Sequence, residues 1–176
     1  MRRLLLSLGV VLAGLPLVAM DQPATAQTGG VEVQRVLASG SEGFNLSTVD
    51  TLLARGDREA SSGALAEAVK SYDKARNAAR SLLSFYRDLG GAFRGLDARI
   101  PRDMDQKGRE AIEKLSQANL RLAAVYRRQN QAEVAVPLLV EVVKLMTPAS
   151  PDGRKAYQQL LEIGFVSTPY TPTAAN

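Results

Sequence analysis

AVKSYDKARNAARSLLSFYRDL, residues 68–89, decides the fold class. Small, aromatic or aliphatic residues return in it at alternating steps of four and three, at Ala68, Tyr72, Ala75, Ala79, Leu82, Tyr86 and Leu89. Such steps stay close to one helical turn, so an α-helix places all seven residues on one face. The stretch therefore predicts a helix over about 64–89 with this seam in the core, ended by Gly90 and Gly91.

The flanking sequence extends the helical pattern in both directions. Ser47 is a candidate N-cap for a helix through Ala60, and residues 61–63 break it. A second seam predicts a helix over about 105–129 and consists of Gly108, Ile112, Leu115, Asn119, Leu122 and Tyr126. A turn at 130–131 then separates it from the next helical stretch.

The last part of the folded region predicts two more helices. Apolar residues from Ala135 to Leu145 form a stripe that ends at Pro148, and a final helix runs from Pro151 to a cap at Gly164. Short turns between helices of this length favour antiparallel neighbours. The predicted fold class is all-α, with antiparallel hairpins stacked as a short solenoid or, alternatively, joined in a plain bundle.

The N-terminal residues have the pattern of an export signal. Arg2 and Arg3 precede an apolar run over 4–20, and Ala24-Thr25-Ala26 supplies the small residues of a cleavage site. We expect a signal peptide at 1–26, a flexible linker at 27–46, a helical domain at 47–166 and a disordered tail at 167–176. Export would place the protein in a periplasm or a thylakoid lumen, and an uncleaved N-terminal membrane anchor is the alternative.

Composition excludes several kinds of site. The 176 residues include no Cys and no His, so thiolate nucleophiles, disulfides and His-ligated metals are impossible. No stretch matches a nucleophile motif such as G-x-S-x-G or S-x-x-K. We therefore expect a protein that is not an enzyme and that holds no metal and no cofactor. An enzyme of unfamiliar type is an alternative.

Two stretches, 52–75 and 119–148, share a plan of helix, tight turn and helix, and they resemble the tetratricopeptide repeat. In the first, the matching small, turn and aromatic positions are Gly56, Gly63, Ala68, Tyr72 and Ala75. In the second, they are Leu122, Ala123, Tyr126, Ala135, Leu139 and Pro148. Leu52 and Asn119 depart from the family pattern, which has an aromatic there. The chain is also similar to small exported repeat proteins of cyanobacterial or Gram-negative envelopes.

The resemblance implies a partner-binding concave face. Carried over residue by residue, that face would include Gln117, Leu120, Ala124, Arg127 and Arg128. Leu120 and Ala124 stand where carboxylate-clamping members of the family have Lys and Asn, so a looser groove is implied instead.

Asn119 and the basic stretch around Pro101 each leave two interpretations open. Asn119 lies on the second seam, where a buried Asn fixes helix register, or it borders the groove and contacts a bound peptide. The stretch FRGLDARIPRDMDQKGRE, 93–110, is a joint between helices with Ile100 extended before Pro101. It is otherwise a docking patch that uses Arg94, Arg99 and Arg102.

The stretch 103–108 has the spacing of a calcium loop, but two lysines stand where ligands are needed. Asp103 or Asp105 is therefore expected to cap a helix.

Charge and export together indicate the kind of partner. Residues 76–128 contain twelve Lys or Arg against six Asp or Glu, a balance that suits an acidic partner. Export argues against nucleic acid. The leading hypothesis is a non-catalytic scaffold or assembly factor that holds an acidic protein segment, and the second is a helical bundle that docks peripherally on an anionic membrane.

Overall fold

A computed structural model describes residues 44–171, and 79% of them are helical. The elements are α1 (Leu46–Ser61), α2 (Leu65–Ala92), α3 (Arg99–Arg128), α4 (Ala132–Met146) and α5 (Pro151–Glu162). These residues contain no strand. The all-α prediction is confirmed. The predicted signal peptide, the linker up to residue 43 and the last five residues lie outside the described part of the chain.

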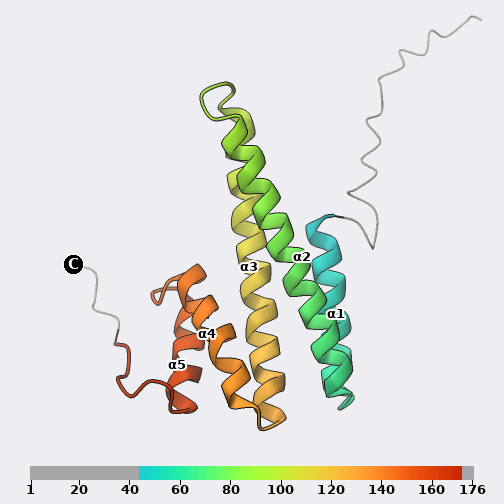
Figure 1. The fold of residues 1–176 in the computed structure, drawn as a ribbon, viewed down its shortest axis with the longest axis vertical. Helices are drawn as coiled ribbons and strands as arrows, with labels where there is room; N and C mark the ends of the chain where they lie inside the picture. Colours follow the sequence, from blue (N-terminus) through green and yellow to red (C-terminus); the bar gives the residue numbers. More distant parts are fainter. Residues whose placement is uncertain (1–43, 172–176) are drawn as a thin grey trace, which may run out of the picture. The chain divides into compact units, whose positions relative to one another are not determined.

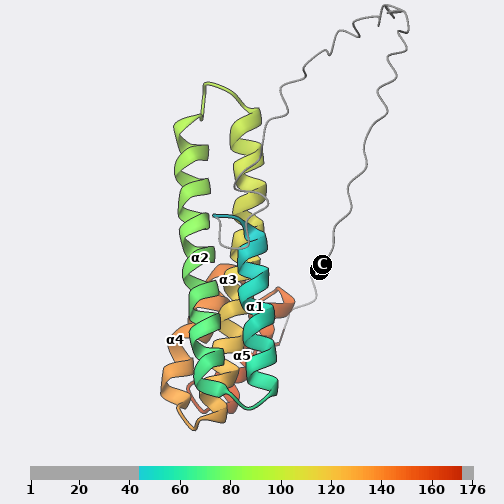
Figure 2. The same ribbon diagram turned by 90° about the vertical axis from the view of Figure 1, so that its right-hand side faces the viewer.

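Each helix packs antiparallel against the next one in sequence, so the five follow one another across the fold (Figures 1 and 2). Helix α3 also contacts α1 and α5, the helices two places before and after it in the chain. The backbones of α2 and α4 do not come into contact. Because α2 and α3 have 28 and 30 residues and the others 12 to 16, the α2–α3 hairpin projects beyond its neighbours. No helix in the described residues is long and apolar enough to cross a membrane.

The first seam lies in the core as predicted, except at its end. Ala68, Tyr72 and Leu82 are buried, but Leu89 is 47% exposed, and Leu83 and Gly90 are buried instead. A straight α-helix turns about 20° per heptad relative to a strict seven-residue repeat. Over three heptads that drift carries position 89 out of the interface, so the prediction for Leu89 is wrong.

The helix ends differ from the sequence predictions where local chemistry competes with them. Asn45, not Ser47, caps α1, because its side-chain oxygen accepts the Thr48 backbone N–H at 2.8 Å. Helix α2 continues through Gly90 and Gly91 to Ala92. Neither glycine has the positive φ that is common where a helix ends. The glycine with a positive φ is Gly95, in the turn that follows.

The expected extended joint at Ile100–Pro101 is also wrong, since both residues lie in the first turn of α3. Proline is tolerated there because the N–H groups of a first turn have no intrahelical acceptor to lose. Asp103 and Asp105 consequently lie inside the helix and do not cap it. Asp97 supplies the local acceptor, and its carboxylate takes the Arg99 backbone N–H at 2.8 Å.

The chain after α5 turns back onto that helix. Tyr157 donates its hydroxyl to the Thr168 carbonyl at 2.8 Å, and its ring lies 6.2 Å from that of Tyr170. Thr168 and Tyr170, in the predicted disordered tail, thus contact α5.

Candidate functional site

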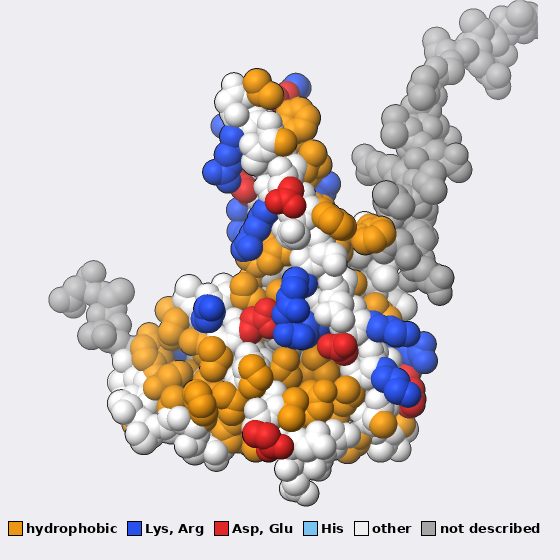
Figure 3. All heavy atoms as spheres, viewed as in Figure 1, with side chains coloured by type: hydrophobic (Ala, Val, Ile, Leu, Met, Phe, Trp, Pro, Cys, Tyr) orange, Lys and Arg blue, Asp and Glu red, His pale blue; other side chains and the backbone are white. Residues whose placement is uncertain are grey.

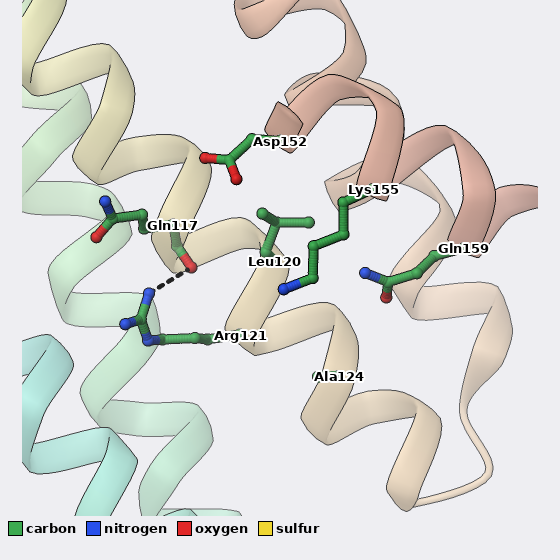
Figure 4. A pocket seen from close by; sticks show the side chains of 7 residues that line it. All are labelled: Gln117, Leu120, Arg121, Ala124, Asp152, Lys155 and Gln159. Carbon is green, nitrogen blue, oxygen red and sulfur yellow. Dashed lines mark hydrogen bonds between the residues drawn. The ribbon is translucent and has the colours of Figure 1, made fainter. Parts of the chain in front are cut away.

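An open groove of about 450 Å³ lies between α3 and α5 (Figure 4). It is lined by Gln117, Leu120, Arg121, Ala124, Asp152, Lys155 and Gln159. We call this surface the α3–α5 groove. Figure 4 shows the polar side chains around its rim, with Leu120 and Ala124 on the α3 wall between them. Its volume falls in the range typical of ligand and peptide sites.

The α3 wall follows from helical spacing. Gln117, Leu120, Arg121 and Ala124 are separated by three or four residues, which places them on one face of the helix. Leu120 is buried with 8% of its surface exposed, and Ala124 is exposed. This wall therefore offers a narrow apolar strip beside the amide of Gln117 and the guanidinium of Arg121.

A chain of contacts through three helices orients Arg121. Its Nε donates to the Asp57 carboxylate of α1 at 2.9 Å, and its Nη1 lies 3.4 Å from the Gln117 carbonyl oxygen. Asp57 also accepts the hydroxyl of Tyr72 of α2 at 2.7 Å. Burial, and then this bond to a carboxylate, raises the pKa of the Tyr72 hydroxyl well above its usual value. Tyr72 therefore stays protonated and keeps donating to Asp57.

Gly56 makes the close approach of Tyr72 possible. A Cβ on this α1 glycine would overlap the Tyr72 ring. The small-residue position that the repeat resemblance assigned to Gly56 thus has a packing reason. The Tyr72 ring occupies the space beside Gly56, and this position places the Tyr72 hydroxyl within hydrogen-bonding distance of Asp57.

The α5 wall begins at a well-capped N-terminus. The Ser150 hydroxyl accepts the Gly153 N–H at 3.0 Å, and Pro151 occupies the first turn. Spacings of three and four residues then place Asp152, Lys155 and Gln159 on the groove side. Lys155 is exposed and has no ion pair with any described side chain.

Arg127 closes one end of the groove. Its guanidinium donates to Gln159 Oε1 at 3.2 Å and to the Glu162 carboxylate at 3.0 Å, joining α3 to α5. Arg128 points the other way and donates to the Ala60 carbonyl of α1 at 3.1 Å. The predicted residues Gln117, Leu120 and Ala124 thus come together in the groove, Arg127 borders it, and Arg128 does not reach it.

Ion pairs fill the corresponding seam between α1 and α3. Lys114 pairs with Asp50, and Arg121 pairs with Asp57. Together with the bond from Arg128 to α1, these contacts cover that side of α3. The open surface of α3 therefore faces α5.

Asn119 lies on another face of α3, in the core. It is fully buried, its Oδ1 accepts Arg76 Nε at 2.7 Å, and its Nδ2 donates to Glu141 Oε2 at 3.1 Å. Glu141 also pairs with Arg76 at 3.0 Å and with Arg80 at 2.8 Å. This partly buried network bridges the gap between α2 and α4. Asn119 has both ends of its amide engaged there and does not line the groove.

The charge of Glu141 is favoured by its partners. Burial alone would raise the pKa of its carboxyl, but hydrogen bonds from Arg80 and Arg76 together outweigh burial and hold that pKa below its usual range. The carboxylate therefore stays ionised at neutral pH.

The three arginines of the expected docking patch lie at the far end of the α2–α3 hairpin. Arg94 belongs to the connecting turn, and Arg99 and Arg102 to the first turn of α3. Arg99 pairs with Asp97 at 2.7 Å. None of them lines the α3–α5 groove. In the neighbouring calcium-like stretch, Asp103 pairs with Lys107 at 3.0 Å, and the described residues contain no acidic cluster able to hold a metal ion.

Sequence reasoning missed four of the groove residues, namely Arg121, Asp152, Lys155 and Gln159. Arg121 stands four residues after Gln117, so the helical spacing already used for α3 could have found it. The α5 residues lie beyond Pro148, where the repeat resemblance ends. The spacing of three and four residues between Asp152, Lys155 and Gln159 indicates a groove wall only once α5 is known to lie beside α3.

No protein-family model, no curated protein and no solved structure matches the chain.

Proposed function

We propose that this protein is a non-catalytic binding scaffold that holds an acidic segment of another protein in the α3–α5 groove. The observation that carries the proposal is the groove itself, whose apolar strip lies between Arg121, a cation fixed by Asp57, and Lys155, a cation with no ion pair among the described residues. An extended segment can place an apolar side chain on Leu120 and a carboxylate near Lys155. The amides of Gln117 and Gln159 are suited to its backbone groups.

The resemblance to tetratricopeptide repeats supports the same surface, because three of its concave-face residues line the groove. The Arg2-Arg3 start, the apolar run and the Ala24-Thr25-Ala26 motif support export. The proposed compartment is a periplasm or a thylakoid lumen, and the proposed role there is assembly or retention of an acidic partner.

The test uses an array of ten-residue peptides and a chain that starts after Ala26. Ala124→Trp fills the exposed strip without touching the core, and Lys155→Glu reverses the unpaired charge. Wild type is expected to select peptides rich in Asp and Glu. Ala124→Trp should abolish selection, and Lys155→Glu should weaken binding about fivefold, as expected for a partly exposed charge pair of about 1 kcal/mol.

The matched control is Ala66→Trp on the exposed surface of α2, which should bind as wild type does. Selection without acidic bias, or binding that survives Ala124→Trp, would contradict the proposal.

A second candidate function rests on the end of the hairpin. Leu96 is 80% exposed beside Arg94 and Arg99, and an apolar side chain among cations suits the surface of an anionic membrane. Co-sedimentation with phosphatidylglycerol vesicles tests it. Binding should fall with salt and with Leu96→Ser, and pelleting equal to that on phosphatidylcholine vesicles would exclude it.

A further inference from the structure

A second cavity lies on the projecting part of the α2–α3 hairpin, distinct from the α3–α5 groove. It has a volume of about 200 Å³ and is lined by Leu83, Arg87, Met104, Asp105, Gly108, Arg109 and Ile112. We call it the hairpin pocket. Its floor is apolar, and two arginines and one aspartate stand around it. It is smaller than a typical small-molecule site, and it matches the scale of a single inserted side chain.

The hairpin pocket faces the same side of the hairpin as α4. Arg76 and Arg80 reach Glu141 of α4, and Leu83 and Arg87 follow Arg80 at steps of three and four on α2. On α3, Ile112 stands seven residues before Asn119, which also bonds Glu141. The pocket therefore continues the side of the hairpin on which α4 lies.

Helix α4 covers only part of that side. It has 15 residues and α3 has 30, so roughly half of α3 extends past it. Figures 1 and 2 show the hairpin continuing beyond the end of α4. On the side of α4, both views draw no other described helix beside this upper stretch. The uncovered surface has the length and direction that another helix needs.

Gly108 has no packing reason to be a glycine. A Cβ at Gly56 would overlap the Tyr72 ring, and one at Gly90 would lie 3.1 Å from Met104 Cβ. A Cβ at Gly108 would meet only Leu83 Cδ1, at an ordinary 3.8 Å. A glycine inside a helix is destabilising relative to alanine. Here it leaves the hairpin pocket open.

The charge around the hairpin pocket indicates what enters it. Arg87 and Arg109 are exposed and have no carboxylate partner within ion-pairing distance among the described residues. Figure 3 shows that basic side chains gather on one edge of the projecting hairpin and that the other edge is mostly apolar. Arg109 Nη2 donates to the neutral Gln106 Oε1 at 2.7 Å, so neither guanidinium has its charge balanced by a described carboxylate. Such guanidiniums favour carboxylates, and an apolar floor favours an aliphatic side chain.

We propose that the hairpin pocket receives one aliphatic side chain of an acidic amphipathic helix from a partner protein, which lies along the hairpin beyond α4. Carboxylates on that helix pair with Arg87 and Arg109, while Gly108 and Leu83 leave room for the inserted side chain. The partner helix takes the place that a longer α4 would have occupied. The site is independent of the α3–α5 groove.

The probe is a designed fluorescent 14-residue helical peptide with a leucine stripe flanked by glutamates. Two further peptides replace the stripe by alanine or the glutamates by lysine. Fluorescence anisotropy with the full chain should show that the first peptide binds at least tenfold more tightly than either of the others. Equal binding of the three peptides would overturn the proposal, and so would partition of the chain to anionic vesicles in preference to the first peptide.

Glycine substitutions separate binding from folding. Gly108→Ala should raise Tm by about 4 °C through helix propensity and still weaken peptide binding about threefold. Gly108→Leu places a leucine side chain in the pocket and should abolish binding. Gly91→Ala is the matched control, because no atom lies within 4 Å of its added Cβ. Unchanged binding by Gly108→Leu in a chain with wild-type circular dichroism would refute the assignment.

Charge reversal completes the test. Arg87→Glu and Arg109→Glu should each weaken binding of the glutamate peptide about tenfold and strengthen binding of the lysine peptide. Lys74→Glu, an exposed residue of α2 outside the pocket, should change neither. The groove variant Ala124→Trp should bind this peptide as wild type does. A failure of the hairpin-pocket proposal can therefore be distinguished from a failure of the groove proposal.

Discussion

Glu141→Ala tests whether the partly buried network between α2, α3 and α4 stabilises the fold. The substitution removes the acceptor of Asn119 Nδ2, which is fully buried, and of Arg76, whose side chain is 22% exposed. An unpaired buried amide costs about 2 kcal/mol, and loss of the charge-assisted bond to Arg76 adds about 1 kcal/mol. Arg80 is 45% exposed, so its share is below about 0.5 kcal/mol. We expect a loss of about 3 kcal/mol, or roughly 10 °C in Tm.

Urea unfolding followed by circular dichroism at 222 nm measures this loss, with Arg80→Ala as the control. Arg80→Ala removes one partner of the same carboxylate and leaves Asn119 paired, so it should cost less than about 0.5 kcal/mol. Equal costs for the two variants would show that the Asn119 amide does not depend on Glu141. The explanation of the network would then be wrong.

The same residue predicts a pH dependence. The pKa of Glu141 is lowered from the ordinary 4.5, so the folded state binds this proton less readily than the unfolded chain does. Its stabilisation is complete above that ordinary value and is lost as the pH falls through the lower folded pKa. The stability difference between wild type and Glu141→Gln should therefore shrink on going from pH 7 to pH 3. A difference that grows in acid would contradict the lowered pKa.

Three further predictions concern packing and capping, each measured by urea unfolding. Gly56→Ala should cost about 2–3 kcal/mol because its Cβ overlaps the Tyr72 ring, and a neutral or stabilising result would remove that constraint. Leu82→Ala should cost about 3 kcal/mol and Leu89→Ala less than about 1 kcal/mol, since the first is 3% and the second 47% exposed. Similar costs would mean that the seam does not drift. Ser150→Ala should cost about 1 kcal/mol through loss of the α5 cap, and no cost would show that Pro151 alone starts the helix.

Periodic patterns in the sequence were enough to predict the helices, because each depends on residues three or four apart. Ala68, Tyr72 and Leu82 show this on α2. The helix ends were harder. Helix α3 begins at Arg99 and not near Asp105, because Pro101 fits a first turn and Asp97 accepts the N–H of Arg99. The sequence prediction used the rule that a residue before proline avoids the helical conformation, and that rule does not take such local contacts into account.

The groove and the network depend on contacts that periodicity does not report. Gln117, Leu120 and Ala124 could be assigned to one face, but their opposite wall comes from α5, beyond the stretch that resembles a repeat. Arg76 and Glu141 are 65 residues apart. The residues next to Arg76 and Glu141 in the sequence do not indicate that these two side chains pair. The pair can be predicted only once α2 and α4 are known to lie on the same side of α3.

The order of packing has a consequence for how the protein opens. Each helix gains its contacts mainly from the helices next to it in the chain, so the structure can lose a terminal helix while its middle stays folded. Helix α5 has 12 residues and forms one wall of the groove. Amide hydrogens of α5 should thus exchange with deuterium sooner than those of the α2–α3 hairpin. Transient detachment of this terminal helix would then let a bulky segment enter from the side.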